Sequence, residues 1–350
     1  MLTPVWWDDG LRLIDQTRLP WAERVLEPQT VDDVADAIRR LCVRGAPAIG
    51  VTAAYGVIVG LRESVEPDLA ARFDQVVETL RATRPTAINL AWALRRQRGV
   101  FQAQQDRTLD RIIDALLAEA DRIRAEDIEA NERLGAFGAE LLHDGDRVLT
   151  HCNAGALATA GHGTALGVIR SAWSQGKRLK VWVDETRPLL QGARLTAWEL
   201  EQEGIPYDVV TDNSVGALMG RGLVDAVVTG SDRVAANGDV ANKIGTYTVA
   251  AMADRHGVPY YAALPTSTID PDVPSGDAIP IEERAPDEVT TINGVRITPE
   301  RASAVNYAFD VTPHDLVAGI ITEVGVLRPP YEASIRAALQ ADGAVHGIAA

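Results

Sequence analysis

Basic residues are scarce in this sequence, and their scarcity bears first on its partners. The chain has 34 Lys and Arg against 49 Asp and Glu, which gives a formal net charge of −15 over 350 residues. The phosphate backbones of nucleic acids bind basic surfaces, so we expect no nucleic-acid partner. A phosphorylated small molecule is compatible with this charge, because a few focused cations are enough to bind it.

Cysteine is scarcer still, since only Cys42 and Cys152 occur. Two isolated cysteines provide neither a disulfide framework nor a metal-ligand spacing, and the six histidines include no HExxH pair. We therefore predict no metal. The glycine patterns of dinucleotide-binding loops and P-loops do not follow any predicted strand, so we predict no cofactor.

Long apolar runs are also missing. Residues 1–10 lack the basic region and the apolar core of a signal peptide, and no apolar run approaches the length of a membrane span. We expect a cytoplasmic protein without a membrane partner.

The composition that remains, 46% hydrophobic and 24% charged, is typical of a folded globular chain. Apolar runs on either side of Asp8-Asp9-Gly10 predict a β-hairpin near the N-terminus. Helical spacing of apolar residues then follows over 31–41, 48–61, 68–81, 86–103 and 106–143, the last bent or divided. We predict a mostly helical N-terminal domain at residues 1–145.

From Arg147 onward, strand-like and helical stretches alternate. The predicted strands are Arg147–Cys152, Lys180–Asp184, Tyr207–Thr211, Ala226–Thr229, Tyr260–Leu264 and Phe309–Val311. Predicted helices lie near 157–170, 189–203, 214–221, 242–256 and 313–323. This alternation predicts a Rossmann-like, doubly wound parallel sheet of the α/β class at residues 146–350. The stretch 266–300 is expected outside the sheet, and a helix is expected after Arg328.

Polar clusters follow the predicted strands, and the carboxyl ends of parallel strands meet at one edge where ligands bind. Cys152 follows the first strand and Asp232 follows the fourth. A thiol near a helix N-terminus can act as a nucleophile or proton relay, although a lone buried cysteine is more often a small hydrophobe. Asp232 is a candidate acid/base group, and Lys243 lies at a predicted helix start, where an anion can bind. The same residues also fit an ordinary surface loop between a strand and a helix.

Two arginines outside this sheet are candidate anion clamps. Arg44 precedes Gly45, which lets backbone amides approach a phosphate, and Arg84 lies in Thr83-Arg84-Pro85. Both also fit solvated helix caps. Glu185, Arg187 and Gln191 fit a structural ion-pair network as well as a site.

Six motifs in order resemble the methylthioribose-1-phosphate isomerase family. They are RGAPAIG (44–50), TRPTAINL (83–90), THCNAGALAT (150–159), DETRPLLQGARLTAWEL (184–200), TGSDRVAANGDVANKIGTY (229–247) and AFDVTP (308–313). The resemblance extends over about residues 3–328. That family forms a wider group with the regulatory subunits of translation initiation factor 2B and with ribose-1,5-bisphosphate isomerases.

The resemblance implies a homodimer that converts 5-methylthioribose 1-phosphate to 5-methylthioribulose 1-phosphate in methionine salvage. It implies Asp232 as proton donor and Cys152 as a group that assists the transition state. The substrate-binding residues that it implies are Arg44, Gly45, Ala46, Arg84, Gln191, Asn242 and Lys243. One departure is Tyr307, where the family pattern has proline before AFDVTP; it puts in doubt only the local shape of that loop and the substrate preference.

Two alternatives stay open. The substrate can be another C5-modified pentose 1-phosphate such as 5-deoxyribose 1-phosphate, or the chain can be a non-catalytic regulator like the initiation-factor subunits. The presence of both Cys152 and Asp232 favours the enzyme. Because no carbon base is evident, we favour a hydride shift between C1 and C2 over an enediolate.

Overall fold

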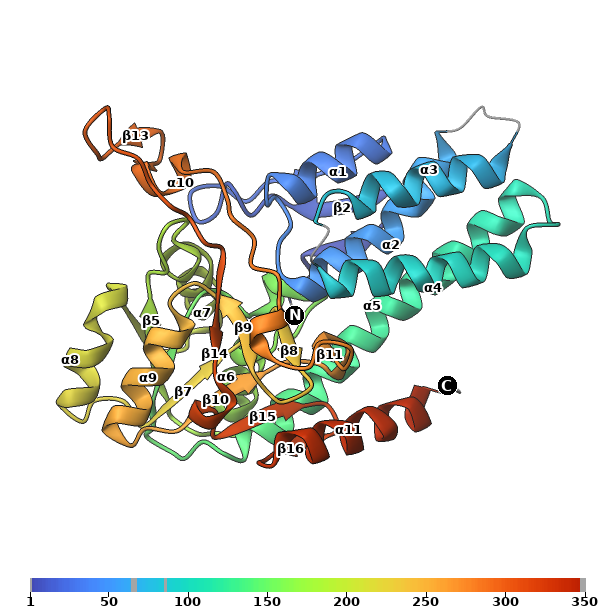
Figure 1. The fold of residues 1–350 in the computed structure, drawn as a ribbon. Helices are drawn as coiled ribbons and strands as arrows, with labels where there is room; N and C mark the ends of the chain where they lie inside the picture. The colour runs from blue at the N-terminus through green and yellow to red at the C-terminus, as the bar shows by residue number, and fades with distance from the viewer. Residues whose placement is uncertain (1, 64–67, 85–86, 347–350) are drawn as a thin grey trace. The chain divides into compact units, whose positions relative to one another are not determined.

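The computed structural model describes residues 2–63, 68–84 and 87–346. The chain forms two compact units, Met1–Ala130 with Gly155–Gly163, and Asn131–Ala154 with Thr164–Ala350. Figure 1 shows the elements with the labels used below. The domain division predicted at residues 145 and 146 stays a prediction, because compactness alone does not show where a chain divides into folding domains.

The first unit opens with the predicted hairpin. Strand β1 (Val5–Trp7) pairs antiparallel with β2 (Leu11–Ile14). A short third strand, β3 (Val25–Leu26), pairs with β2; two residues carry too little periodicity to be predicted. The hairpin prediction is confirmed.

Helices make up the rest of the first unit. They are α1 (Val31–Arg39), α2 (Ala46–Arg62), α3 (Leu69–Arg81), α4 (Ile88–Gln104) and α5 (Leu109–Ala139). All five were predicted, but α5 is one undivided helix that continues into the second unit. Thr30 is the N-cap of α1, since its Oγ1 accepts a hydrogen bond from the backbone amide of Asp33.

Helix α2 is the centre of this unit and lies beside α4 (Figure 1). Apart from Pro47, all of its side chains from Ala46 to Leu61 are buried. Small residues allow this close packing: a Cβ on Gly50 would lie 2.8 Å from the carbonyl oxygen of Asn89 on α4. The helix is therefore apolar all round because neighbours cover every face of it.

The second unit is built on a seven-stranded sheet of order β16-β15-β10-β7-β4-β5-β6. The strands are β4 (Arg147–Thr150), β5 (Lys180–Asp184), β6 (Tyr207–Val210), β7 (Ala226–Thr229), β10 (Tyr260–Ala263), β15 (Gly319–Thr322) and β16 (Gly325–Leu327). All neighbours are parallel except β16, which is antiparallel to β15. The predicted Rossmann-like sheet is confirmed.

Helices cover both faces of this sheet. They are α6 (Ala165–Ser174), α7 (Ala197–Glu203), α8 (Val215–Gly220), α9 (Thr246–His256) and α11 (Tyr331–His346). Alternate residues of β7 point to opposite faces: Val227 joins the core under α8, α9 and α11, and Val228 the core under α6 and α7. Burial on both faces explains why the central strands β7 and β10, all of whose residues are buried, lack the alternation of polar and apolar residues.

Three predictions near the C-terminus were wrong. Phe309–Thr312 is a strand, β14, but it lies in a separate four-stranded sheet of order β11-β8-β9-β14. Residues 313–323 form a short 3-10 turn and the main-sheet strand β15 instead of a helix. Residues 242–243 close strand β9 (Val240–Lys243), so the predicted helix begins later, at Thr246.

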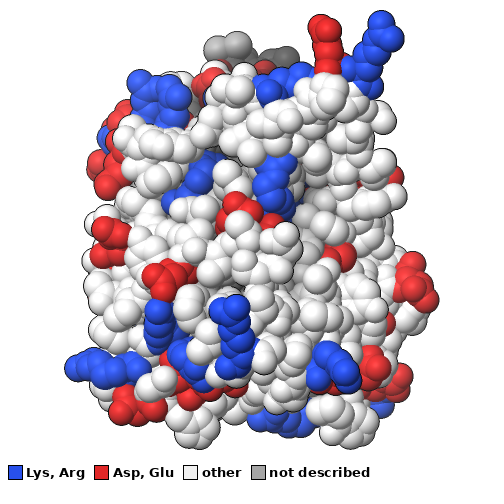
Figure 2. Space-filling model, turned by 90° about the vertical axis from the view of Figure 1, so that its left-hand side faces the viewer, with Lys and Arg blue, Asp and Glu red and all other residues white. Residues whose placement is uncertain are grey.

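The other strands of the small sheet are β8 (Arg233–Ala235) and β11 (Ile269–Asp270). As predicted, 266–300 stays outside the main sheet; it contains α10 (Asp287–Thr290) and the hairpin β12 (Thr291–Ile292) with β13 (Val295–Arg296). Within the described ranges, no helix is both long and apolar enough to cross a membrane. On the face shown in Figure 2, acidic and basic side chains are interspersed.

A matched pair of glycine substitutions tests the packing of α2 on α4. Gly50→Ala places a methyl group against the Asn89 carbonyl, and we expect it to lower the free energy of unfolding by about 1–3 kcal/mol through overpacking. Gly99→Ala lies on exposed α4 surface, where the new Cβ meets nothing within 4 Å; we expect it to raise that free energy by about 0.5–1 kcal/mol. Denaturant unfolding measures both, and equal signs would refute the packing argument.

Candidate functional site

The strand order changes direction between β4 and β7, which are neighbours in the sheet. From β4 the chain proceeds outward through β5 and β6, and from β7 it proceeds the other way through β10 and β15. Ligands of open parallel sheets bind in the crevice outside such a switch point. Cys152 follows β4 and Asp232 follows β7, so both predicted catalytic residues flank this point.

Cys152 is held in an unusual backbone conformation. Its φ is +64°, which a residue with a Cβ rarely adopts. The amide donates to Thr186 Oγ1 at 2.8 Å, and the carbonyl accepts from Thr196 Oγ1 at 2.6 Å. Of the helix predicted near 157–170, only a 3-10 turn at Ala156–Ala158 lies soon after Cys152, and the α-helix α6 begins at Ala165. Two threonines, rather than helix amides, therefore determine how the thiol is presented.

Asp232 lies in the short connection from β7 to β8. Its amide donates to the Ala241 carbonyl at 2.9 Å, and Ser231 Oγ donates to the same oxygen at 3.1 Å. The connection is thus attached to β9. Asp232 is half-buried.

The two predicted substrate-binding residues that follow lie on strand β9. Asn242 donates to Thr246 Oγ1 at 2.9 Å. Lys243 donates to the Ala308 carbonyl at 2.9 Å, and its ammonium lies 4.9 Å from the centre of the Phe309 ring. The AFDVTP motif therefore holds the Lys243 side chain in place through these two contacts. The sequence did not reveal this role.

The helix N-terminus next to these residues is occupied. Asp310 accepts the amides of Gly245 at 2.7 Å and Tyr247 at 3.1 Å. Burial raises the pKa of this carboxyl despite the two amides that favour its charged form. The amides of Gly245 and Tyr247 are therefore not free, because a carboxylate of the chain itself accepts them; the binding of a substrate anion at this helix start stays a prediction.

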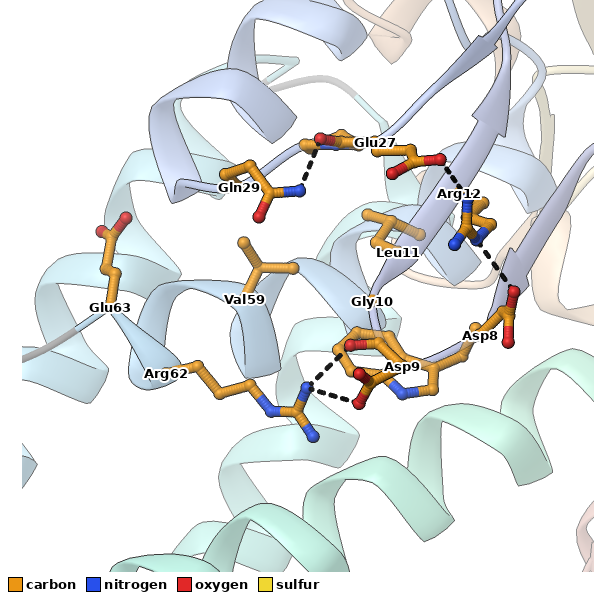
Figure 3. A pocket seen from close by; sticks show the side chains of 12 residues that line it. Asp8, Asp9, Gly10, Leu11, Arg12, Glu27, Gln29, Val59, Arg62 and Glu63 are labelled. Atoms are coloured by element: carbon orange, nitrogen blue, oxygen red, sulfur yellow. Dashed lines mark hydrogen bonds and ion pairs between the residues drawn. The ribbon is translucent and has the colours of Figure 1, made fainter.

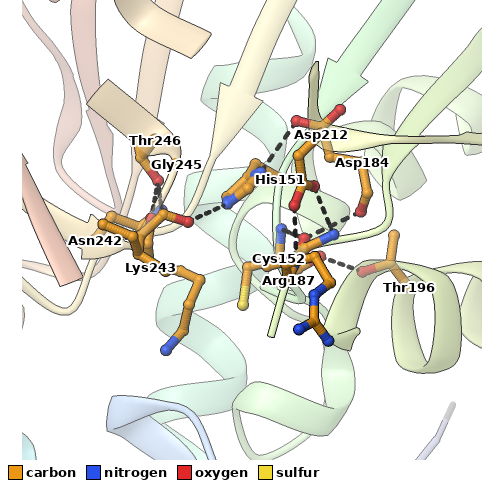
Figure 4. A network of polar contacts seen from close by, with 12 residues as sticks. His151, Cys152, Asp184, Arg187, Thr196, Asp212, Asn242, Lys243, Gly245 and Thr246 are labelled. Atoms are coloured by element: carbon orange, nitrogen blue, oxygen red, sulfur yellow. Dashed lines mark hydrogen bonds and ion pairs between the residues drawn. The ribbon is translucent and has the colours of Figure 1, made fainter. Parts of the chain in front are cut away.

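A buried charged pair lies behind Cys152 (Figure 4). His151 Nδ1 is 3.0 Å from Asp184 Oδ2, and Nε2 is 2.8 Å from the Ile244 carbonyl. Burial alone would lower the pKa of His151, but its hydrogen bond with Asp184 and the charge of that carboxylate raise it. Burial raises the pKa of Asp184 to about 6, against the opposing effect of His151.

His151, Asp184 and Asp212 bring their possible ligand atoms within 4.8 Å of one another. Most of these atoms are engaged in hydrogen bonds: both His151 nitrogens face acceptors, and Asp212 accepts the amides of Thr186 and Arg187 at 2.7 Å each. Among the described residues, Asp184 Oδ1 has no hydrogen-bond partner. This donor set favours a hydrogen-bonded ion-pair network over a metal site.

The ends of Lys243, Cys152 and Arg187 point to the same side in Figure 4, away from the His151–Asp184 pair. Arg187 donates to the Pro188 and Val289 carbonyls at 2.8 and 2.7 Å, so it attaches the α10 segment to the sheet edge. Gln191 is buried, and among the described residues its Oε1 has no hydrogen-bond partner. An unsatisfied buried acceptor is costly, which suits a group that awaits a ligand hydroxyl.

The remaining predicted residues belong to the first unit. Arg44 is half-buried before α2, and Ala46 is its first, buried residue. Gly45 has a φ of +92°, and a Cβ there would lie 2.4 Å from the Ala158 carbonyl oxygen, so only glycine fits. Arg84 is half-buried, while residues 85–86 of its motif lie outside the described residues. The roles of these residues stay predictions.

A pocket of about 400 Å³ lies elsewhere in the first unit, beside the β1–β2 hairpin (Figure 3). Its charged groups are paired: Arg12 with Asp8 and Glu27, and Arg62 with Asp9. None of the described residues that line it belongs to the predicted site.

The model of the initiation factor 2 subunit family matches residues 42–329. The chain belongs to the initiation factor 2 subunit family. Two relatives are methylthioribose-1-phosphate isomerases, from Thermotoga petrophila (55% identity; 95% of this chain, 97% of the relative) and from Albidiferax ferrireducens (56%; 94% and 94%).

Two solved structures are similar over nearly the whole chain. The 5-methylthioribose 1-phosphate isomerase from Pyrococcus horikoshii has a TM-score of 0.90 at 43% identity, with 97% of this chain and 96% of that one covered. The initiation factor eIF-2B subunit delta from A. fulgidus has a TM-score of 0.86 at 44% identity, with 97% and 100% covered. The same fold thus occurs both in a protein named as an isomerase and in one named as an initiation-factor subunit.

Several residues that shape the site were missed from the sequence. Thr186 and Thr196 lie inside the DETRP motif region, and Asp310 lies in AFDVTP. Their only signal was membership of a family motif, because their partners are far away along the chain.

Removal of the Asp310 carboxylate tests its role at α9. Asp310→Ala leaves two amides without their acceptor, and we expect the free energy of unfolding to fall by about 1–2 kcal/mol. Asp315→Ala, at an exposed position nearby, is the control and should change little. Denaturant unfolding compares the two; an equal effect would show that Asp310 does not hold the helix N-terminus.

Proposed function

We propose that this chain converts 5-methylthioribose 1-phosphate to 5-methylthioribulose 1-phosphate, an aldose–ketose isomerisation of methionine salvage. Support comes from isomerases that match it at 55% identity over 95% of its length. The structural observation that carries the proposal is the position of Cys152 and Asp232 on the two sides of the switch point.

The first chemical problem is the ring. An aldose phosphorylated at C1 is locked as a cyclic form, because its anomeric oxygen carries the phosphate. Asp232, as a carboxylic acid, protonates the ring oxygen while the bond from that oxygen to C1 breaks. General acid catalysis of this kind contributes about 10²–10⁴-fold to a rate.

The second step moves hydrogen within the substrate. The hydride on C2 passes to C1 with its electron pair, C2 becomes the carbonyl carbon, and the C2 hydroxyl gives its proton to Cys152. The two protein groups then regain their starting protonation states by exchange with solvent. Electrons balance inside the sugar, so no redox partner is consumed.

The substrate phosphate and hydroxyls are bound by the predicted set: Arg44, Gly45, Ala46, Arg84, Gln191, Asn242 and Lys243. Lys243 is pre-oriented by Ala308 and Phe309, and Gln191 offers an unused acceptor. Preorganised charge of this kind stabilises a transition state without further reorganisation.

Substitution of the two proposed catalytic residues tests this assignment. We expect Asp232→Asn and Cys152→Ala each to lower kcat by about 10²-fold or more, measured as ketose phosphate formed from 5-methylthioribose 1-phosphate. Cys42→Ala is the control: burial raises the pKa of that thiol to about 11, so it should keep the parent rate.

The possible outcomes distinguish an error in the proposed reaction from an error in the proposed catalytic residues. An active parent with unharmed Asp232 and Cys152 variants would keep the reaction and refute these roles. A parent that binds pentose 1-phosphates without turnover would favour the non-catalytic regulator, the alternative that the eIF-2B-type relative represents.

Reaction in deuterated water tests the route of the hydrogen. A hydride shift keeps the original hydrogen on carbon, so the ketose formed by the parent should carry almost no solvent deuterium at C1. Mass spectrometry of the product measures this. Substantial incorporation would refute the hydride route in favour of an enediolate.

The homodimer implied by the family resemblance stays a prediction.

A further inference from the structure

His151 directly precedes Cys152, and the proposed mechanism does not use it. Its ring is buried, with 1% of the residue's surface exposed. Nδ1 lies 3.0 Å from Asp184 Oδ2 and Nε2 lies 2.8 Å from the Ile244 carbonyl oxygen. An ionised carboxylate and a carbonyl only accept hydrogen bonds, so with Asp184 ionised both ring nitrogens donate and the ring is an imidazolium.

These two bonds join segments that are distant in the chain. His151 comes from the loop after β4 that presents Cys152, Asp184 ends β5, and Ile244 directly follows Lys243 on β9. The ring also fits against Gly245: a Cβ there would lie 2.8 Å from His151 Cε1, and its φ is +104°. The contact is therefore tight enough to fix the spacing of the two segments.

Among the described residues, three carboxylates interact with the ring. The charges of Asp184 and Asp212 raise the pKa of His151, and the ring in turn lowers the pKa of Asp310 on β14. Asp212 and Asp310 are themselves satisfied by backbone amides. The imidazolium is thus the cation that these three carboxylates have in common.

We propose that His151 is a positioning residue, whose two donated hydrogen bonds hold the Cys152 loop and the Asn242–Lys243 segment at the spacing that isomerisation requires. The kinetic part of this inference rests on the proposed function. Misplacement of reacting groups by about 1 Å can cost about 10²-fold in rate, which sets the size of the expected effect.

Asp184 allows geometry and charge to be separated. In Asp184→Asn, the side-chain amide can donate to Nδ1 of a neutral His151, while Nε2–H still donates to Ile244. In Asp184→Ala, the Nδ1 contact is lost. The asparagine variant should therefore preserve the spacing, and the alanine variant should not.

The charge state is read directly by nitrogen NMR of protein labelled with ¹⁵N-histidine, with the His151 signals assigned through His151→Gln. We expect both ring nitrogens to be protonated at pH 7 in the parent, and a neutral ring in Asp184→Asn. The amide signals of Cys152 and Gly245 should shift in Asp184→Ala and stay near the parent positions in Asp184→Asn. A neutral His151 in the parent would overturn the proposal.

Kinetics on 5-methylthioribose 1-phosphate complete the test. We expect His151→Gln and Asp184→Ala to lower kcat by about 10²-fold, and Asp184→Asn to retain most of the parent rate. His256→Gln, at an exposed position on α9, is the matched control and should behave as the parent.

The pH profile adds a readout that a structural role alone would not move. The raised pKa of His151 means that its contribution is complete below its ordinary value of 6.5 and is lost as pH rises through the folded value. The parent should lose activity on that alkaline limb, and Asp184→Asn, with its neutral ring, should lack it.

Besides a neutral ring in the parent, three results would overturn the positioning role: parent kinetics in His151→Gln, equal loss of activity in folded Asp184→Asn and Asp184→Ala, or unchanged Cys152 and Gly245 signals in Asp184→Ala. If His151→Gln does not fold, the two Asp184 variants and the NMR spectrum of the parent still test the positioning role. If the parent shows no turnover, the proposed function is contradicted, and the NMR spectra alone then test the positioning role.

Discussion

The second unit depends on one constraint: six strands of its sheet run parallel, and apolar cores lie on both faces of that sheet. Parallel strands direct all of their carboxyl ends to one edge, and ligands of such sheets bind where the strand order changes direction, here between β4 and β7. Cys152 and Asp232 are brought to that point by strand order alone. The chemistry of the site is thus placed by the way the sheet is wound rather than by local sequence.

Three carboxylates lie close together near the carboxyl ends of these strands. Asp184, Asp212 and Asp310 all lie near His151, and an isolated buried carboxylate is costly. Each one has particular hydrogen-bond partners: the His151 ring for Asp184 Oδ2 and backbone amides for the other two. The same donors connect the loops that carry the proposed substrate-binding residues, so satisfying the buried charges also rigidifies the site.

The small sheet of β11, β8, β9 and β14 positions two proposed substrate-binding residues that do not lie on the parallel sheet. It orients Asn242 and Lys243 on β9 through the antiparallel partner β14. The carbonyl of Ala308, the ring of Phe309 and the carboxylate of Asp310 all contact this segment or the start of α9. A motif first noticed only as a family marker therefore acts as a support for the proposed site.

The sequence by itself determined the elements whose apolar spacing is strong, namely the hairpin, the five N-terminal helices and five of the parallel strands. It also indicated Cys152 and Asp232, because both directly follow a buried strand. Only the tertiary structure decided that 319–322 is a strand, that β14 pairs with β9, and that Asp310 occupies the start of α9. Residue spacing reports on neighbours within one element, whereas these features depend on partners tens of residues away, which local periodicity does not encode.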